Sequence, residues 1–205
     1  MKTLAVRADA YASIGTGHIM RCLTLCRQLK PHFEKIVFIC VDAPGSLADL
    51  IRNQGFEVSG INRTGHAFDP GEDADQTASV LETLKPELLI TDHYSIDRTW
   101  HSRVRPIVRK IAVIDDMADR PHDCDLLLDQ NYYPGMADRY AGLVPDTCTS
   151  LLGPEYALLR PEFRRLRKKK TDSISRLENV LVNFGGSDYT NEISKIFDAA
   201  EELLN

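Results

Sequence analysis

A loop and the start of a helix near the N-terminus contain the residues best suited to chemistry. Residues 4–8 form an apolar run that ends in Asp9. A loop with Gly15 and Gly17 then leads into His18, and apolar residues recur after it at the spacing of one helix face. The free N–H groups and the dipole of a helix N-terminus favour an anionic ligand and a neutral imidazole. The segment therefore predicts a ligand site in which His18 can accept a proton.

This segment alone fits a second interpretation, a tight turn with a helix cap in which His18 is only solvated. The loop lacks the third glycine of the dinucleotide-binding fingerprint, and no Gly-Lys-Ser/Thr follows it as in a P-loop. The local motif is consistent with both interpretations.

Polar residues also follow three other expected strands, at 92–94 (Asp-His-Tyr), 115–116 (Asp-Asp) and 129–131 (Asp-Gln-Asn). An aspartate after a strand often caps the next turn. Four such clusters in one parallel sheet, however, meet at the carboxyl ends of the strands, where ligands bind. We expect one edge of the sheet, called the rim below, to hold Gly15, Gly17, His18, Asp92, Tyr94, Asp116 and Asn131.

Two chemistries remain open for these carboxylates. They could hold a divalent metal ion together with a nucleotide phosphate. They could instead bind the hydroxyl and amide groups of a sugar and orient His18 in the tautomer that accepts a proton. The sequence contains no H-E-x-x-H or G-x-S-x-G motif, which argues against a zinc metalloprotease or a serine hydrolase.

The elements that must position these residues alternate between strand and helix. This order predicts an α/β fold with a Rossmann-like, mostly parallel sheet and helices on both faces. Strands are expected at 35–40, 56–61, 87–91, 110–114, 126–128 and 151–152, and helices at 46–54, 73–84 and 97–109, with a loop over 62–72.

The last part of the chain reads as the beginning of a second domain. We expect an N-terminal catalytic domain over 1–170, a linker over 171–177, and over 178–205 the first strand and helix of a truncated second domain. The expected strand is 179–184, and the expected helix is 191–204. Some 30 residues cannot bury a core of their own, because domains usually need about 50 or more. The basic run at 160–170 is interpreted as a solvated helix end.

Composition excludes several classes of protein. The formal net charge of −5 gives no support to nucleic-acid binding, and no apolar run approaches the length of a membrane span. The N-terminus lacks a basic segment followed by an apolar signal core, so a cytoplasmic location is expected. Five cysteines without a C-x-x-C pair argue against a disulfide framework and a zinc ribbon. Cys124 lies between Asp123 and Asp125, which argues against a nucleophilic role.

The string R-x-D-A-x3-I-G-T-G-H-I-M-R-C-L-x-L, which begins at Arg7, resembles the opening motif of the UDP-sugar hydrolases of pseudaminic acid biosynthesis. Spore-coat polysaccharide proteins of the same family look similar too. The resemblance continues through T-D-H-Y at 91–94, I-D-D at 114–116, H-D-C-D-L-L-L-D-Q-N at 122–131, Y-A-G-L-V-P at 140–145, L-G-P-E-Y-A-L-L-R-P-E-F at 152–163 and N-F-G-G-S-D at 183–188. It covers essentially the whole chain.

The resemblance implies a fold and an activity. Members of this family resemble glycosyltransferases of the B type, with two Rossmann-like domains that face each other across a cleft. They release UDP from UDP-2,4-diacetamido-2,4,6-trideoxy-β-L-altropyranose by attack of water at the anomeric carbon. The second domain is expected to hold most of the UDP, and neither a metal ion nor a cofactor is implied.

The resemblance also implies roles for individual residues. His18 matches the general base that activates water, and Tyr94 matches a tyrosine near the attack. Tyr11 stands in a loop position where the family more often has a small residue. The residues expected to bind the substrate are Arg7, Asp9, Gly15, Gly17, Arg21, Asp116, Asn131, Tyr156, Leu159, Arg160, Gly185 and Gly186.

Two other functions compete with hydrolysis. In a glycosyltransferase of similar fold, His18 would deprotonate an acceptor hydroxyl rather than water. In a non-catalytic module, the same rim would only bind a sugar nucleotide. Consumption of a UDP-sugar without any acceptor separates the hydrolase from both.

Overall fold

The computed structural model describes residues 2–9, 15–43, 45–62, 68–167, 180–183 and 190–204. The chain divides into two compact units, residues 1–159 and residues 160–205. Each unit is described by itself. Residues 171–177, the expected linker, lie outside the described residues, as do Tyr11, Gly185 and Gly186.

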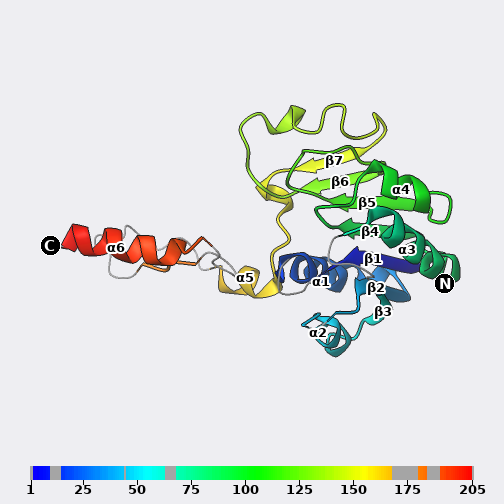
Figure 1. Cartoon of the computed structure of the whole chain (residues 1–205), viewed down its shortest axis with the longest axis horizontal. Helices are drawn as coiled ribbons and strands as arrows, with labels where there is room; N and C mark the ends of the chain where they lie inside the picture. Colours follow the sequence, from blue (N-terminus) through cyan, green and yellow to red (C-terminus); the bar gives the residue numbers. More distant parts are fainter. Residues whose placement is uncertain are drawn as a thin grey trace. The chain divides into compact units, whose positions relative to one another are not determined.

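Seven parallel strands form one sheet in the first unit, in the order β3-β2-β1-β4-β5-β6-β7 (Figure 1). Every neighbouring pair of strands is parallel, which confirms the predicted sheet. The strands are β1 (Thr3–Ala8), β2 (Lys35–Val41), β3 (Glu57–Ile61), β4 (Leu88–Asp92), β5 (Lys110–Ile114), β6 (Leu126–Asp129) and β7 (Thr149–Leu152).

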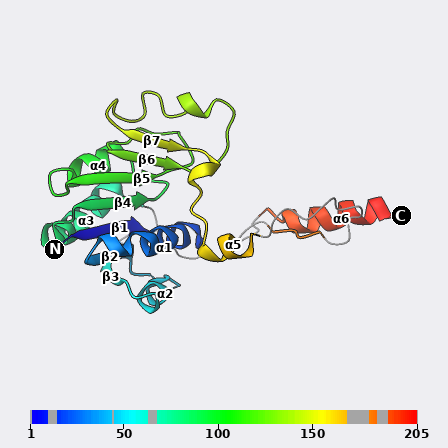
Figure 2. The same ribbon diagram turned by 180° about the vertical axis from the view of Figure 1, so that it is seen from behind.

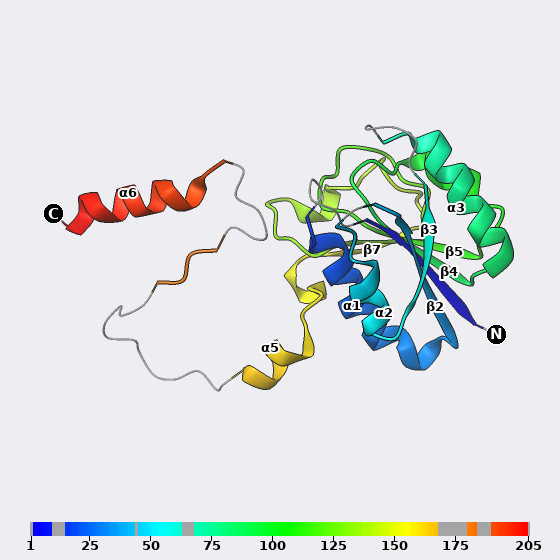
Figure 3. The same cartoon turned by 60° about the horizontal axis from the view of Figure 1, so that its bottom comes forward.

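Helices cover both faces of this sheet, as the alternating pattern predicts (Figures 2 and 3). One core packs α1 and α2 against the sheet, and the other core packs α3 and α4 against the opposite face. The helices of this unit are α1 (Gly17–Leu29), α2 (Ala48–Asn53), α3 (Pro70–Leu84) and α4 (Arg98–Val104), with 3-10 turns η1 (Lys30–His32), η2 (Met136–Asp138) and η3 (Pro154–Tyr156).

The alternation of side chains along β1 decides which residues face which helices. Leu4, Val6 and Ala8 belong to the core under α1, whereas Ala5 belongs to the core under α3 and α4. Arg7 has the same parity as Ala5, because successive side chains of a strand point to opposite faces. Its guanidinium is therefore directed into the interior beneath α3 and α4.

Helix α3 begins earlier than the sequence pattern predicts, at Pro70 rather than Asp73. The side chain of Asp69 accepts hydrogen bonds from the N–H groups of Gly71 and Glu72, and Pro70 stands in the first turn, where its missing N–H costs nothing. Helix α4 ends at Val104, earlier than the predicted Arg109, and turns follow it.

The second unit contains α5 (Pro161–Leu166) and α6 (Glu192–Leu204). The strand predicted over 179–184 is not formed in the part that the structure describes, because residues 180–183 are irregular. A strand is stable only when a neighbouring strand satisfies its N–H and C=O groups, and residues 180–183 are not part of the seven-stranded sheet.

Two features are absent from the part of the chain that the structure describes. None of the helices found there is both long and apolar enough to cross a membrane. Within the same described ranges, no group of three or more His, Cys, Asp or Glu side chains is arranged to hold a metal ion.

Candidate active site

The candidate site lies on the rim between β1 and β4, where the strand order changes direction. In open α/β sheets this topological switch point is the place where ligands bind. His18 is in the first turn of α1, the helix that follows β1, and Asp92 is the last residue of β4. Because β1 and β4 are paired, with Ala8 opposite Asp92, the two side chains reach each other.

The imidazole of His18 is held by the carboxylate of Asp92. Nδ1 of His18 lies 2.5 Å from Oδ1 of Asp92, and both side chains are buried. An ionised carboxylate can only accept a hydrogen bond, so Nδ1 of His18 carries the hydrogen and donates it. In the neutral ring Nε2 then has a free lone pair, and it has no hydrogen-bond partner among the described residues. The geometry therefore prepares Nε2 as a proton acceptor.

Arg21, one turn further along α1, keeps Asp92 ionised. Its Nε and Nη2 atoms donate to the two oxygens of Asp92, each at 2.6 Å. Burial by itself would raise the pKa of Asp92, but hydrogen bonds from Arg21 and His18 outweigh it and hold the pKa below its ordinary value. Nη1 of Arg21 also donates to Oδ2 of Asp116 at 3.1 Å. Arg21 thus links two carboxylates of the rim, and its guanidinium is occupied by protein contacts.

Tyr94 lies beside the histidine at the surface. Its ring meets the His18 ring edge to face, with 4.6 Å between the centroids, and its side chain is half exposed. Partial burial, followed by the charge of Asp116, raises the pKa of Tyr94 above its ordinary value. The hydroxyl therefore stays protonated at neutral pH, where it can donate a hydrogen bond but cannot remove a proton.

Asp116 contributes a carboxylate whose two oxygens have different surroundings. Its Oδ2 accepts from Arg21, whereas Oδ1 is buried and unpaired in the part of the chain that is described. Its backbone carbonyl accepts from the hydroxyl of Tyr133 at 3.1 Å and from Nη2 of Arg139 at 2.8 Å. These bonds fix the residue in place, with Oδ1 enclosed by the protein.

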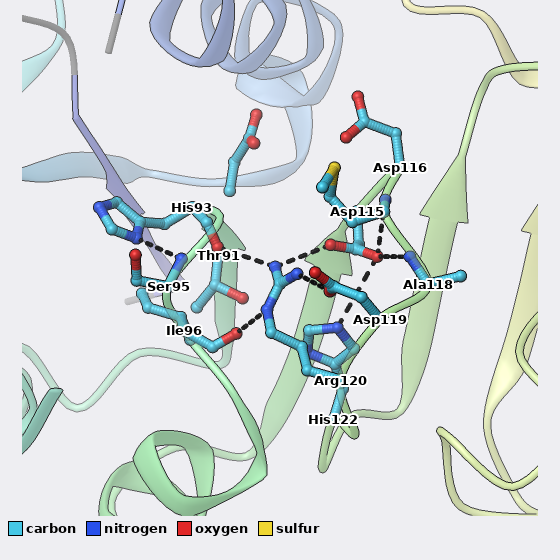
Figure 4. A network of polar contacts seen from close by, with 12 residues as sticks. Thr91, His93, Ser95, Ile96, Asp115, Asp116, Ala118, Asp119, Arg120 and His122 are labelled. Atoms are coloured by element: carbon cyan, nitrogen blue, oxygen red, sulfur yellow. Dashed lines mark hydrogen bonds and ion pairs between the residues drawn. The ribbon is translucent and has the colours of Figure 1, made fainter. Parts of the chain in front are cut away.

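A second arginine ties together the loops that carry Tyr94 and Asp116 (Figure 4). Arg120 donates to Oδ1 of Asp115 at 2.7 Å and to the carbonyl oxygens of Ile96 and His93 at 2.9 and 3.1 Å. Oδ2 of Asp115 accepts from the N–H of Ala118 at 2.9 Å and so closes the turn after β5. The network fixes the loop after β4 and the loop after β5 relative to each other.

The structure places Arg7 and Asp9 in the interior rather than on the rim. The side chain of Arg7 is 0% exposed, and it pairs with both Asp9 and Asp73. Nε1 of Trp100 donates to Asp73 at 2.9 Å, and the N–H of Val41 donates to Asp9 at 2.8 Å. Burial opposes these charges, but the ion pairs hold the pKa of Asp9 below its ordinary value. Both residues, expected to bind substrate, are occupied in holding β1 to its neighbours.

The remaining candidates have different surroundings. Gly17 is the first residue of α1, and Gly15 has a φ of +80°, a conformation that favours glycine. Asn131 is exposed after β6, and Tyr156 and Leu159 are exposed after β7. Arg160 belongs to the second unit, where its guanidinium lies over the ring of Phe163 at 5.4 Å. Gly185 and Gly186 lie outside the described residues.

The sequence predicts that Asp92 lies on the rim, but it does not identify Asp92 as the hydrogen-bond partner of His18. It gives no role to Arg120. The signal for Asp92 was available in part, because a strand that pairs with β1 must end beside the start of α1. The partner strand of β1 cannot be read from the order of elements alone. For Arg120 the sequence offers no signal, since its partners come from two separate loops, after β4 and after β5.

The chain resembles known proteins in sequence, although no family model matches it. A UDP-2,4-diacetamido-2,4,6-trideoxy-beta-L-altropyranose hydrolase of Campylobacter jejuni is 33% identical over 193 residues, which cover 93% of this chain and 62% of that protein. An uncharacterized protein of Methanocaldococcus jannaschii is 22% identical over 205 residues, which cover 98% of this chain and 40% of that protein. The chain thus spans about three fifths of the first relative and two fifths of the second.

Among solved structures, MurG of Acinetobacter baumannii has a similar fold. The TM-score is 0.50 at 11% sequence identity, over 66% of this chain and 43% of that one. At this identity the likeness concerns the fold alone, and it agrees with the Rossmann-like α/β class of the first unit. The chain is therefore related in sequence to a UDP-sugar hydrolase, and its sheet and helices have the architecture expected from its sequence.

Proposed function

We propose that this chain carries the water-activating half of a UDP-sugar hydrolase. The observation that supports this most directly is the 2.5 Å contact between His18 and Asp92 at the switch point of the sheet. A histidine oriented by a carboxylate is a general base, a role typically worth about 10² to 10⁴ in rate. The sequence similarity to the hydrolase supplies the substrate class.

In the proposed reaction, Nε2 of His18 removes a proton from a water molecule. The water oxygen attacks the anomeric carbon, the bond from that carbon to the β-phosphate oxygen breaks, and UDP leaves with the bonding electrons. UDP is a stabilised leaving group, so its charge needs dipoles or cations more than it needs a proton. The proposed products are UDP and the free sugar.

Two neighbours of His18 are proposed to act on the substrate. The half-exposed side chain of Tyr94 carries a hydroxyl donor beside the imidazole, and the partly buried carboxylate of Asp116 is an acceptor on the same rim. A sugar with acetamido groups presents both kinds of partner, carbonyl oxygens and N–H groups. UDP-2,4-diacetamido-2,4,6-trideoxy-β-L-altropyranose is accordingly the proposed substrate, in pseudaminic acid biosynthesis. Gly15, Gly17, Arg21 and Asn131, together with the exposed Tyr156 and Leu159 after β7, remain proposed contacts.

The nucleotide is proposed to bind mainly outside the first unit. The division into a domain over 1–170, a linker over 171–177 and the start of a second domain over 178–205 is part of this proposal, as is contact of Arg160, Gly185 and Gly186 with substrate. The relative extends beyond the part that this chain matches, which agrees with a further UDP-holding domain. A cytoplasmic location also remains part of the proposal.

A glycosyltransferase is the second candidate, because a histidine oriented in this way would also deprotonate a sugar hydroxyl. The deciding experiment incubates the full-length protein with the UDP-sugar in water enriched in ¹⁸O. Hydrolysis by the proposed route releases UDP without an acceptor and places ¹⁸O in the sugar. Release of UDP only when an acceptor is added would favour the transferase, and binding without turnover would favour a non-catalytic module.

A further inference from the structure

Two cysteines of the first unit have their sulfur atoms in contact. Sγ of Cys124 lies 3.5 Å from Sγ of Cys148, and both are free thiols in this structure. Cys124 is buried, whereas Cys148 is partly exposed. The other three cysteines, Cys22, Cys26 and Cys40, are buried. Neither thiol of the contacting pair takes part in the site around His18.

The backbone fixes this contact at the amino ends of two neighbouring strands. Cys124 precedes β6 and Cys148 precedes β7, and the N–H of Thr149 donates to the carbonyl oxygen of Asp125 at 3.0 Å. The strands continue in parallel register from Leu126 opposite Thr149. The rim with His18 is at the opposite, carboxyl ends of the strands.

Arg105 also holds the residues on either side of Cys124. It donates to Asp123 at 2.8 Å and to Asp125 at 2.6 Å. Because its neighbours are fixed, the Cys124 thiol stays directed at Cys148. A disulfide bond of about 2.05 Å needs the two sulfur atoms to approach by only about 1.5 Å.

We propose that Cys124 and Cys148 form a reversible redox-modification site, which a peroxide converts into an intramolecular disulfide. The thiolate of Cys148, the more exposed of the two, attacks a peroxide oxygen, the O–O bond breaks, and a sulfenic acid forms as water leaves. The thiolate of Cys124 then attacks Sγ of Cys148, the S–O bond breaks and a second water leaves. The two thiols lose two electrons to the peroxide, and a dithiol reductant reverses the change.

The surroundings of the two thiols slow their oxidation. Burial, followed by the neighbouring thiol, raises the pKa of Cys124, and burial also raises the pKa of Cys148. Thiolate is the reactive form, so alkaline solution favours the reaction.

The disulfide would close the base of the segment 124–148. That segment carries Tyr133 and Arg139, whose side chains hold the backbone carbonyl of Asp116. Cross-linking its two ends restricts the unfolded chain and stabilises the segment. We expect slower hydrogen exchange of its backbone amides and no change at His18, so this inference does not depend on the proposed function.

The test is oxidation of the whole chain by hydrogen peroxide in mildly alkaline buffer, followed by non-reducing peptide mapping. The expected product is monomeric, has lost two hydrogen atoms in mass, contains a Cys124–Cys148 peptide pair, and unfolds at a midpoint raised by roughly 5 °C or more. Dithiothreitol should remove both the cross-link and the rise of the unfolding midpoint.

Three variants make the result specific. Cys148→Ser and, separately, Cys124→Ala should abolish the cross-link and the thermal shift, whereas Cys40→Ala, which removes a different buried thiol, should keep both. A disulfide that involves another cysteine or a second chain would overturn the proposal. So would full alkylation of both thiols after oxidation, or a thermal shift that survives in Cys148→Ser.

Discussion

Among single residues, the relation between His18, Asp92 and Arg21 determines what the rim can do. A neutral imidazole exists in two tautomers, and the carboxylate of Asp92 selects the one that leaves Nε2 free. Arg21 satisfies both oxygens of that carboxylate, so the buried charge is paired. Its contribution is therefore to position Asp92, which accepts hydrogen bonds from both Nε and Nη2.

The first prediction concerns Asp92→Asn. The amide can either donate to or accept from the imidazole, so the tautomer of His18 is no longer fixed. Turnover should fall by about 10² to 10⁴, with a small change in KM, because the effect appears when the proton moves. The double variant Asp92→Asn/His18→Asn should be no slower than the slower single variant, since the two residues act as a unit.

Steady-state hydrolysis of the UDP-sugar by the full-length protein checks this prediction. Asp75→Asn, which changes an exposed aspartate on α3, is the matched control and should leave turnover unchanged. An Asp92→Asn protein within a few-fold of the unchanged protein would show that the carboxylate is not needed to orient His18.

The sequence could predict some of these residues because their signals are local. His18 follows from a glycine loop and the start of a helix, and the contact of His18 with Tyr94 confirms that the two share the rim. The burial of Arg7 and Asp9 could not be predicted in this way. Arg7 is neutralised by Asp73, 66 positions later, and a residue so distant in sequence gives no local signal.

Among the elements, β1 contributes to both faces of the sheet in different ways. Its alternate residues Leu4, Val6 and Ala8 pack in the core with α1, and Ala5 packs in the core with α3 and α4. Arg7 extends to that second face and pairs with Asp73 of α3, which also accepts from Trp100 of α4. The buried ion pair thereby joins a strand and two helices.

The second prediction concerns Arg7→Met, which removes the charge while keeping a long, flexible side chain. Asp9 and Asp73 would be left as buried carboxylates without their cation, so the free energy of unfolding should fall by about 3 to 5 kcal/mol. Arg52→Met is the control, because its ion pair with Asp49 on α2 is exposed and should contribute less than about 1 kcal/mol. Urea denaturation measures both values. Equal losses for the two variants would contradict the framework role of Arg7.

The order of elements could be predicted from the sequence better than their ends. Short apolar runs marked the buried strands, and β5 begins and ends as predicted, at Lys110 and Ile114. The start of α3 at Pro70 depends on the capping side chain of Asp69, a feature that hydrophobic periodicity does not register. The apolar residues 180–182 satisfy a strand pattern, yet a pattern cannot supply the neighbouring strand that a sheet requires.

For the molecule as a whole, three buried histidines make the fold sensitive to acid. Burial lowers the pKa of His93 and His122 to about 4, and it also lowers the pKa of His101 well below its ordinary value. Both ring nitrogens of His122 lack a hydrogen-bond partner among the described residues, and its ring lies 5.5 Å from that of His101. Protonation of these rings is therefore much more favourable in the unfolded chain.

The third prediction is the resulting dependence of stability on pH. The unfolded chain binds protons at these histidines below about pH 6.5, but folded His93 and His122 bind them only near pH 4. The contribution of these two rings to the free energy of unfolding should stay constant above pH 6.5 and fall as the pH drops from 6.5 toward 4, by about 3 kcal/mol for each ring.

Chemical denaturation at several pH values separates the contribution of one ring. His122→Leu should make the slope between pH 6.5 and 4 shallower, whereas His32→Asn, which changes an exposed histidine of η1, should leave it as it is. An unchanged slope in His122→Leu would contradict the assignment of acid sensitivity to this ring.

The class of fold could be predicted for the whole first unit, because the alternation of strand and helix is a property of the chain order. The order of the strands in the sheet could not, since alternation permits several arrangements. The place of β4 beside β1, which brings Asp92 to His18, is a result of the structure.

The most direct measurement compares His18→Asn with the unchanged full-length protein in single-turnover hydrolysis and UDP binding. Asparagine is tolerated near a helix start, so α1 should form as before, while the proton acceptor is lost. The account predicts a rate lower by about 10² to 10⁴ at neutral pH and a nearly unchanged affinity for UDP. A rate close to that of the unchanged protein would remove His18 from the mechanism. A loss of UDP affinity in parallel with the rate would instead assign His18 to the diphosphate.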